Sequence, residues 1–183
     1  MTRRNELRDN ALNYFLEHGL AELSLRPLAE HIGTSARLLI YHFDSKEKLI
    51  TAVMEEARSR VQQSVMAMMH AAQGEASMES FWGWVTDKEN IRYVRLLFEV
   101  QVLALQNPAI YAQFLSDTSS SWLEVIEYGI PESADRRTIA TLCGAVIDGL
   151  VLDYMNTGDL DRTTAALKFF VALLSQDSSK FKK

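Results

Sequence analysis

The chain has 183 residues, of which 48% are hydrophobic, and its three prolines and eight glycines interrupt it rarely. This composition excludes a wholly disordered chain and disfavours a turn-rich β-architecture, so we expect long helices around a sizeable core. The formal net charge of −5 does not by itself indicate a nucleic-acid partner, and residues 1–60 hold nine basic and nine acidic side chains, so an argument for DNA binding must rest on spacing.

Hydrophobic spacing and helix stop signals predict an all-α chain of about nine helices. In chain order, the predicted helices span residues 2–18, 25–32, 35–43, 46–72, 78–86, 90–106, 110–128, 134–156 and 161–175. Residues 73–75 are the best candidate for a break after the long fourth helix. The sequence contains no strand-like alternation bounded by turns and no internal repeat.

The second and third predicted helices have the spacing of a helix-turn-helix. Leu28 and Ile32 lie four residues apart and share one face of the second helix. Ala29 beside them is small enough to let another helix cross closely, and Gly33 suits the tight turn that follows. Leu39 then falls where the third helix would bury a side chain. This combination favours a helix-turn-helix over an ordinary helical hairpin in which the glycine is only a C-cap.

The third helix begins with polar and basic residues, an arrangement typical of a helix that enters the major groove of DNA. Ser35 and the free N–H groups at this helix start could also hold a phosphate. Tyr41, His42 and Lys46 follow, where the phosphate backbone would run. The sequence therefore predicts a double-stranded DNA partner.

The stretch Gly33-Thr34-Ser35 through Leu39-Ile40-Tyr41-His42-Phe43, followed by Ser45-Lys46-Glu47-Lys48-Leu49, resembles the TetR family of bacterial regulators. The resemblance covers roughly the first 55 residues, and beyond them only the number and length of helices agree. Ile40 departs from the family pattern, which usually has tyrosine there, and could instead touch a thymine methyl group. The resemblance implies base contacts by Arg26 and Arg37, with Ala36 and Leu38 facing the groove. It also implies that Tyr41, His42 and Lys46 clamp the DNA backbone, and that Arg3 (or its neighbour Arg4) acts as an arm on the minor groove or a phosphate.

The last two predicted helices are apolar on nearly all sides, which predicts burial on two faces. One face is expected to meet a second copy of the chain in a four-helix interface, an arrangement that the resemblance also implies. The alternative is that both are central core helices. The predicted interface residues are Val146, Leu150, Val151, Tyr154, Phe169, Phe170 and Leu173.

Large, soft side chains are frequent in the segment between the DNA-reading helices and the predicted dimer helices. Such side chains can line an apolar pocket for a small ligand, although each of them taken singly is more simply a core residue. The predicted lining residues are Met69, Trp82, Phe98, Gln101, Trp122 and Cys143. Residues 1–45 are then expected to form the DNA-binding domain, and residues 46–183 the ligand-binding and dimerisation domain.

Motifs of other chemistries are missing from the sequence. Its four histidines fall on separate predicted helices without metal-ligand spacing, so no metal or cofactor is expected. Cys143 is the only cysteine, which fits a reducing cytoplasm, and acidic residues interrupt the longest apolar stretch, so no membrane span is expected. We therefore predict a ligand-released homodimeric repressor that is not an enzyme. The alternatives are an all-helical enzyme or lipid-binding protein with an incidental helical hairpin, and a DNA architectural protein without sequence preference.

Overall fold

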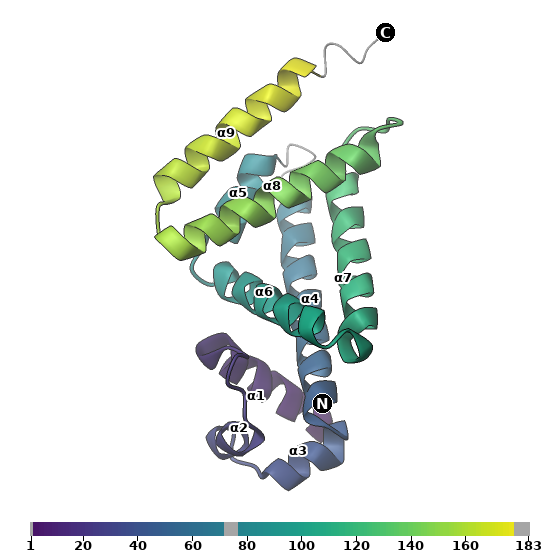
Figure 1. Cartoon of the computed structure of the whole chain (residues 1–183), viewed down its shortest axis with the longest axis vertical. Helices are drawn as coiled ribbons and strands as arrows, with labels where there is room; N and C mark the ends of the chain where they lie inside the picture. Colours follow the sequence, from purple (N-terminus) through teal and green to yellow (C-terminus); the bar gives the residue numbers. More distant parts are fainter. Residues whose placement is uncertain (1, 72–76, 178–183) are drawn as a thin grey trace. The chain divides into compact units, whose positions relative to one another are not determined.

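The computed structural model describes residues 2–71 and 77–177, and these contain nine α-helices and no strand (Figure 1). The helices are α1 (Arg3–His18), α2 (Leu25–His31), α3 (Ala36–Phe43), α4 (Lys46–Ala71), α5 (Met78–Val85), α6 (Asn90–Gln106), α7 (Pro108–Tyr128), α8 (Arg136–Thr157) and α9 (Leu160–Asp177). The all-α prediction is confirmed.

The predicted helix boundaries lie within two residues of the observed ones. The start of α7 differs from the prediction, because Pro108 belongs to the predicted break and is instead the first residue of the helix. Proline is well suited to that position, since the missing N–H would have no partner there and the fixed φ matches the helix. The predicted break at residues 73–75 lies outside the described residues.

The chain divides into two compact units. Unit 1 comprises Met1–Ser64 and Lys88–Ser120, and unit 2 comprises Val65–Asp87 and Ser121–Lys183. Helices α4 and α7 each contribute residues to both units. Unit 1 therefore holds more than the predicted DNA-binding domain of residues 1–45, because most of α4 (residues 46–64), all of α6 and more than half of α7 (residues 108–120) also belong to it. The functional division at residue 45 stays a prediction.

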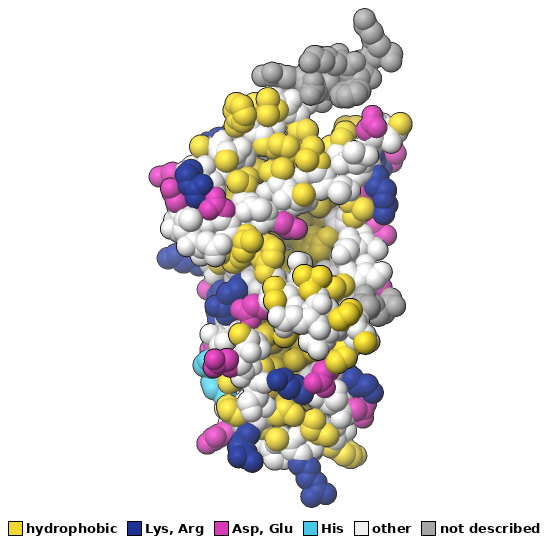
Figure 2. Space-filling view, in the orientation of Figure 1, with side chains coloured by type: hydrophobic (Ala, Val, Ile, Leu, Met, Phe, Trp, Pro, Cys, Tyr) yellow, Lys and Arg dark blue, Asp and Glu magenta, His cyan; other side chains and the backbone are white. Residues whose placement is uncertain are grey.

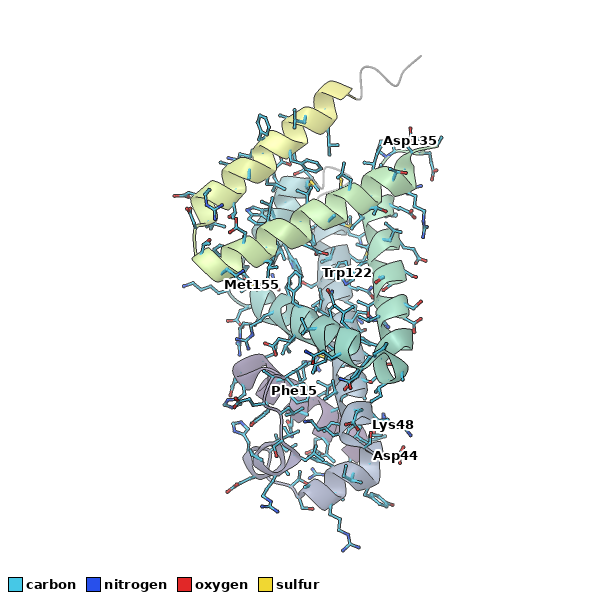
Figure 3. All side chains as sticks on the ribbon, viewed as in Figure 1. Phe15, Asp44, Lys48, Trp122, Asp135 and Met155 are labelled. Carbon is cyan, nitrogen blue, oxygen red and sulfur yellow. The ribbon has the colours of Figure 1, made fainter. Side chains whose placement is uncertain are left out.

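The core of unit 1 is built from faces with helical spacing. On α1, the buried Leu7, Ala11 and Phe15 repeat at intervals of four residues, and Phe15 points into the interior in Figure 3. Leu49 and Val53 on α4 are buried with the same spacing. A buried leucine of this kind contributes roughly 2–5 kcal/mol, the usual cost of truncating it to alanine.

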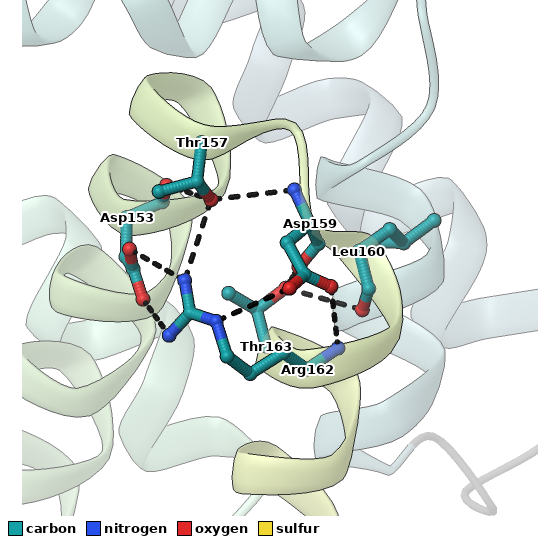
Figure 4. Close-up of polar contacts among 6 residues, drawn as sticks. All are labelled: Asp153, Thr157, Asp159, Leu160, Arg162 and Thr163. Carbon is teal, nitrogen blue, oxygen red and sulfur yellow. Dashed lines mark hydrogen bonds and ion pairs between the residues drawn. The ribbon is translucent and has the colours of Figure 1, made fainter.

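Helices α8 and α9 pack against one another in unit 2. Ala140, Cys143, Ile147 and Val151 form the buried face of α8. The helix ends at Gly158, whose φ of 71° is a left-handed conformation that glycine adopts without a steric penalty. After this turn Arg162 on α9 reaches back to Asp153 on α8 with two hydrogen bonds of 2.8 and 2.9 Å (Figure 4). The glycine turn and these two hydrogen bonds orient the start of α9 relative to the end of α8.

Helix α8 is also, among the described residues, the one helix long and apolar enough to cross a membrane by length and composition. A helix in the core or subunit interface of a soluble protein meets the same test. Only 22% of its apolar window is buried within the chain, so much of an apolar helix is left open.

Candidate nucleic-acid interface

The connection between α2 and α3 is a tight corner. Gly33 has a φ of 68°, a left-handed conformation that a residue with a side chain rarely adopts. The Thr34 N–H donates to the Ala29 carbonyl at 2.8 Å and closes the corner. Leu28 and Ala29 are buried on the inner face of α2, as the spacing predicted. The corner therefore has the form of a helix-turn-helix.

Helix α3 is oriented by two side chains that point inward. Leu39 and Phe43, four residues apart, are buried. On the opposite face Arg37 and Tyr41 are exposed, and Tyr41 retains 78% of its accessible surface. Together with the partly exposed Ile40 they form what we call the outer face of α3. Since these three residues lie at positions i, i+3 and i+4, the outer face is one continuous stripe along the helix.

The start of α3 is capped by Ser35, whose hydroxyl oxygen accepts a hydrogen bond from the Leu38 N–H at 3.2 Å. The hydroxyl proton of Ser35 is not used in this cap and can be donated outward. The backbone N–H groups of the first turn carry the positive end of the helix dipole. This end of α3 is therefore suited to an anionic partner such as a phosphate.

The corner between α3 and α4 gathers further cations. Arg4 on α1 donates from Nε to the His42 carbonyl at 3.2 Å, and its guanidinium lies 4.9 Å from the centre of the Phe43 ring. Lys48 pairs with Asp44, which has a positive φ of 67°. Lys48 was not among the predicted site residues, and Arg4 was predicted only as the alternative to Arg3. The i,i+4 spacing of Asp44 and Lys48 is visible in the sequence and could have indicated Lys48. No feature of the sequence indicates the contact of Arg4 with residues 42 and 43.

The other predicted DNA-reading residues have varied surroundings. Arg26 is exposed on α2, and Arg3 is exposed but paired with Glu6 at 2.9 Å. Lys46 is half-buried at the start of α4. Backbone and Ser45 hydrogen bonds hold the pKa of the neighbouring Glu47 below its ordinary value, so this corner also carries a negative charge. The half-buried predicted residues on α3 are Ala36, Leu38 and His42.

The predicted ligand-binding residues divide between the two units. Phe98 and Gln101 lie on α6 in unit 1, whereas the remaining four lie in unit 2. Trp82 is buried, and its indole N–H donates to Thr164 on α9 at 2.8 Å. Trp82 therefore fastens α5 to α9, as a core residue does. The predicted residues in unit 2 are Met69, Trp82, Trp122 and Cys143.

Aromatic side chains cluster in unit 2 around α5. The Phe81 ring stacks on Trp84 with centroids 5.7 Å apart and meets Trp122 edge-on at 6.5 Å; Trp122 is labelled in Figure 3. Burial raises the pKa of the Cys143 thiol, which leaves it protonated at neutral pH and unsuited to act as a nucleophile.

A surface depression of about 390 Å³ lies in unit 1, lined by charged and apolar residues from α1, α3, α4 and α7. Its charged side chains include Arg4, Lys48 and Glu55. None of the residues predicted to bind an apolar ligand lines it.

The predicted interface residues on α8 and α9 lie in unit 2, and one of them needs correction. Val151 retains only 1% of its surface, because it packs into the core of its own chain. Phe169 and Leu173 are exposed, and Val146, Leu150, Tyr154 and Phe170 are half-buried. Leu142 and Leu152 on α8 are exposed as well but were not predicted to be interface residues. Figure 2 shows apolar side chains in yellow over α8 and α9.

Two of the histidines, which have no metal-ligand spacing in the sequence, lie close together in the structure. Glu17, His18 and His31 come from the ends of α1 and α2, and their potential ligand atoms all lie within 4.8 Å of one another. Sequence spacing could not reveal this cluster, because thirteen positions separate His18 from His31.

Comparison with known proteins agrees with this geometry. A family model described as "Bacterial regulatory proteins, tetR family" matches residues 7–53. The chain is 24% identical to the HTH-type transcriptional repressor AcnR of Corynebacterium efficiens, over 87% of this chain and 80% of that protein.

Solved structures share the fold over nearly the whole chain. One is a transcriptional regulator from Rhodococcus sp. Rha1, with a TM-score of 0.80, 18% identity and coverage of 96% of this chain and 97% of that one. Another is a transcriptional regulator from Saccharomonospora viridis in complex with choline, with a TM-score of 0.74, 19% identity and coverage of 92% and 95%. The matched segment 7–53 contains α2, α3 and the corner between them. We conclude that residues 7–53 match the tetR family of bacterial regulatory proteins, and that the chain as a whole shares the fold of these solved transcriptional regulators.

Proposed function

We propose that the chain is a transcriptional repressor that binds a palindromic DNA site as a homodimer and is released by a small ligand. The observation that carries this proposal is the outer face of α3, where Arg37, Ile40 and Tyr41 project from a helix held in place by the buried Leu39 and Phe43. Repression is proposed because AcnR is named a repressor. A role on the chromosome also implies a cytoplasmic location.

In the proposed complex the outer face of α3 enters the major groove. Arg37 and Arg26 read base edges, because the guanidinium fork matches the two acceptors of guanine. Ala36, Leu38 and Ile40 make apolar contacts in the groove. The residues proposed to hold phosphates are Arg3, Ser35, Tyr41, His42 and Lys46, with Arg4 and Lys48 added from their place at the α3–α4 corner.

A second copy is proposed to cover the open apolar face of α8 and α9. On α8 this face runs through Leu142, Ala145, Gly149 and Leu152, all exposed and spaced at three and four residues. Within residues 2–71 and 77–177, no atom lies within 4 Å of a Cβ built on Gly149, so these residues give no reason for a glycine in mid-helix. A mid-helix glycine costs about 1 kcal/mol relative to alanine. A partner helix approaching closely would account for it.

The corresponding face of α9 contains Ala165, Phe169 and Leu173, also exposed at helical spacing. Two such helices from each subunit would bury four apolar surfaces together. Dimerisation also supplies the two recognition helices that a palindromic site needs, at a separation of roughly 34–36 Å.

The proposed ligand is small and largely apolar, and we assign it to unit 2. The rings of Phe81, Trp84 and Trp122 provide apolar and π surface there. The related Saccharomonospora viridis regulator was solved with choline, a cation of the kind that aromatic faces attract. Of the predicted lining residues, Met69, Trp122 and Cys143 remain in this proposal.

Helix α4, which has residues in both units, is proposed to carry the ligand signal toward the DNA-reading helices, and within unit 1 α6 is proposed to hold α1. The Glu99 carboxylate on α6 accepts a hydrogen bond from the Leu20 N–H at 2.5 Å, and Arg95 donates to the Leu16 carbonyl at 3.1 Å. The Leu16 carbonyl lies at the C-terminal end of α1, and the Leu20 N–H lies in the loop that follows it. A shift of α6 would therefore pull on α1. A coupling of about 1–3 kcal/mol suffices for a useful switch.

The connection of α1 to α4 is a network of charges. Arg8 bridges Asp9 and Glu56 with distances of 2.9 Å, and Arg60 contacts the same two acids at 3.1 and 2.7 Å. All four side chains are partly buried, which makes the pairs stronger than exposed ones. A change in the tilt of α4 would therefore move α1 through these ion pairs.

Selection of bound fragments from a random pool of duplex DNA tests the proposal. The full-length protein is expected to enrich a two-fold symmetric motif with half-sites one helical turn apart. Binding without an enriched motif would instead indicate an architectural DNA-binding protein. Failure to retain any duplex at low salt would overturn the DNA-binding proposal and favour an all-helical binding protein or enzyme.

A further inference from the structure

Three surface side chains that can bind metal ions converge where α1 and α2 end. Glu17 and His18 are the last two residues of α1, and His31 is the last residue of α2. One ligand atom from each of the three lies within 4.8 Å of the others, and His18 Nε2 is 3.8 Å from the Glu17 carboxylate. Figure 2 shows histidine side chains in cyan beside acidic ones on the surface. The cluster lies entirely within unit 1.

The two imidazoles are held by a shared aromatic neighbour. The Tyr14 ring, one turn before His18, lies 4.3 Å from the His18 ring and 5.1 Å from the His31 ring. The histidine rings themselves are 5.5 Å apart. Tyr14 thus limits the directions in which both imidazoles can point. Because the fold already orders the two imidazoles, a metal ion that binds them would cost less conformational entropy.

We propose that Glu17, His18 and His31 bind one divalent transition-metal ion, with Zn²⁺ the best match. Two imidazole nitrogens and one carboxylate oxygen form a common three-residue ligand set for zinc, and water completes the tetrahedron. Bonds of about 2.0–2.1 Å place tetrahedral ligand atoms roughly 3.3 Å apart. All three side chains are exposed, so rotations about their χ angles can close the remaining distance without moving the helices.

The composition of the site also predicts which ions it rejects. Mg²⁺ and Ca²⁺ require six or more oxygen ligands, and a single carboxylate beside two imidazoles does not provide them. Imidazole nitrogen suits Zn²⁺, Ni²⁺, Co²⁺ and Cu²⁺. The proposed selectivity is therefore for transition metals over alkaline-earth ions.

A bound ion would join the end of α1 to the end of α2. Helix α2 packs against both α1 and α3. The ion would therefore stabilise the helix-turn-helix by an additional cross-link, and this stabilisation grows with the logarithm of the ion concentration relative to its Kd. This inference concerns metal binding alone and does not depend on the proposed DNA function.

The test is a titration of the full chain, freed of any affinity tag, with Zn²⁺ by calorimetry and with Co²⁺ by visible absorption. We expect one ion per chain, no heat with Mg²⁺, and a rise in Tm on adding Zn²⁺. His31→Gln and His18→Gln should each weaken binding at least about tenfold and reduce the rise in Tm at a given Zn²⁺ concentration. His70→Gln is the matched control, because His70 is also exposed on a helix but lies outside the cluster.

Equal Zn²⁺ affinity in wild type and in both cluster variants would overturn the proposal, as would wild-type protein that binds no Zn²⁺ at micromolar concentration. Loss of binding in His70→Gln but not in His31→Gln would also overturn it. Circular dichroism of the metal-free variants should match the wild type, since the substituted side chains are exposed.

Discussion

The outer face of α3 and the open face of α8 and α9 are both exposed in the single chain, but their chemistry differs. Arg37 and Tyr41 present charge and a hydroxyl, which water solvates well. Leu142 and Phe169 keep 48% and 68% of their surface, and they present only hydrocarbon. Burying apolar surface gains about 25 cal/mol of free energy for each Å², and this gain is lost while the surface stays exposed. The outer face of α3 can therefore remain exposed until a polar partner binds, whereas the face of α8 and α9 favours a permanent apolar partner.

The largest expected effect comes from a charge placed in the α8–α9 face. Leu142→Asp should weaken dimerisation by about 3–5 kcal/mol, because each subunit would bury an unpaired carboxylate. Sedimentation velocity over a range of concentrations measures the shift. Leu105→Asp is the control, since Leu105 on α6 is equally apolar and 76% exposed but outside this face. Equal weakening by both substitutions would contradict the assignment of the interface.

A side chain added at Gly149 tests the close approach of a partner helix. Gly149→Leu should weaken the dimer by roughly 1–3 kcal/mol through overpacking, although the single chain has room for the new side chain. Gly83→Leu is the matched control, because Gly83 is also helical and exposed, and a Cβ placed on it meets no atom within 4 Å. A Gly149→Leu protein that dimerises as tightly as wild type would show that no helix packs closely there.

Substitutions at the DNA-reading helix should separate specificity from affinity. Arg37→Ala is expected to cost about 1–3 kcal/mol on the selected site and to flatten the preference among bases. Lys46→Ala should weaken binding to all sequences alike and reduce the dependence on salt, because it removes one phosphate contact. Gel-shift titrations of selected and scrambled duplexes measure both. Wild-type behaviour of both variants would remove these residues from the interface.

The bond between α6 and α1 should have a moderate effect on stability. Glu99→Gln keeps an acceptor for the Leu20 N–H but removes the charge, so it should lower the free energy of unfolding by about 1 kcal/mol. Urea unfolding followed by circular dichroism measures this. Glu124→Gln, an exposed carboxylate on α7, serves as the control. A larger loss in the control would argue against a role of Glu99 in holding α1.

The smallest expected effect belongs to the exposed pair of Asp153 and Arg162. Hydrogen bonds from Arg162 lower the pKa of Asp153 in the folded chain, so the pair stabilises it above the ordinary pKa of aspartate. That stabilisation is lost as the pH falls through the lowered pKa. Asp153→Asn should therefore reduce Tm slightly at neutral pH and not at strongly acidic pH. A difference in Tm that persists in acid would assign the effect to packing instead.

The spacing of residues along the chain was sufficient to predict much of the outer face of α3. The four-residue interval between Leu39 and Phe43 determines which side of α3 is buried, and Arg37 and Tyr41 must then face outward. Helix limits were equally predictable, because caps, glycines and apolar periods act within a few residues. The α8–α9 face was predicted less well, since an apolar residue looks the same in sequence whether it meets its own core, as Val151 does, or solvent, as Leu152 does.

The amino-acid sequence was enough to predict the helices of the described residues, the glycine corner and the outward direction of α3, because each depends on residues within one or two helical turns. The burial of Val151, the contact of Arg4 with the α3–α4 corner and the meeting of Glu17, His18 and His31 became known only from the folded chain. These outcomes depend on how separate helices pack against one another. Such packing is set by the shapes of many side chains together, which no short interval of sequence encodes.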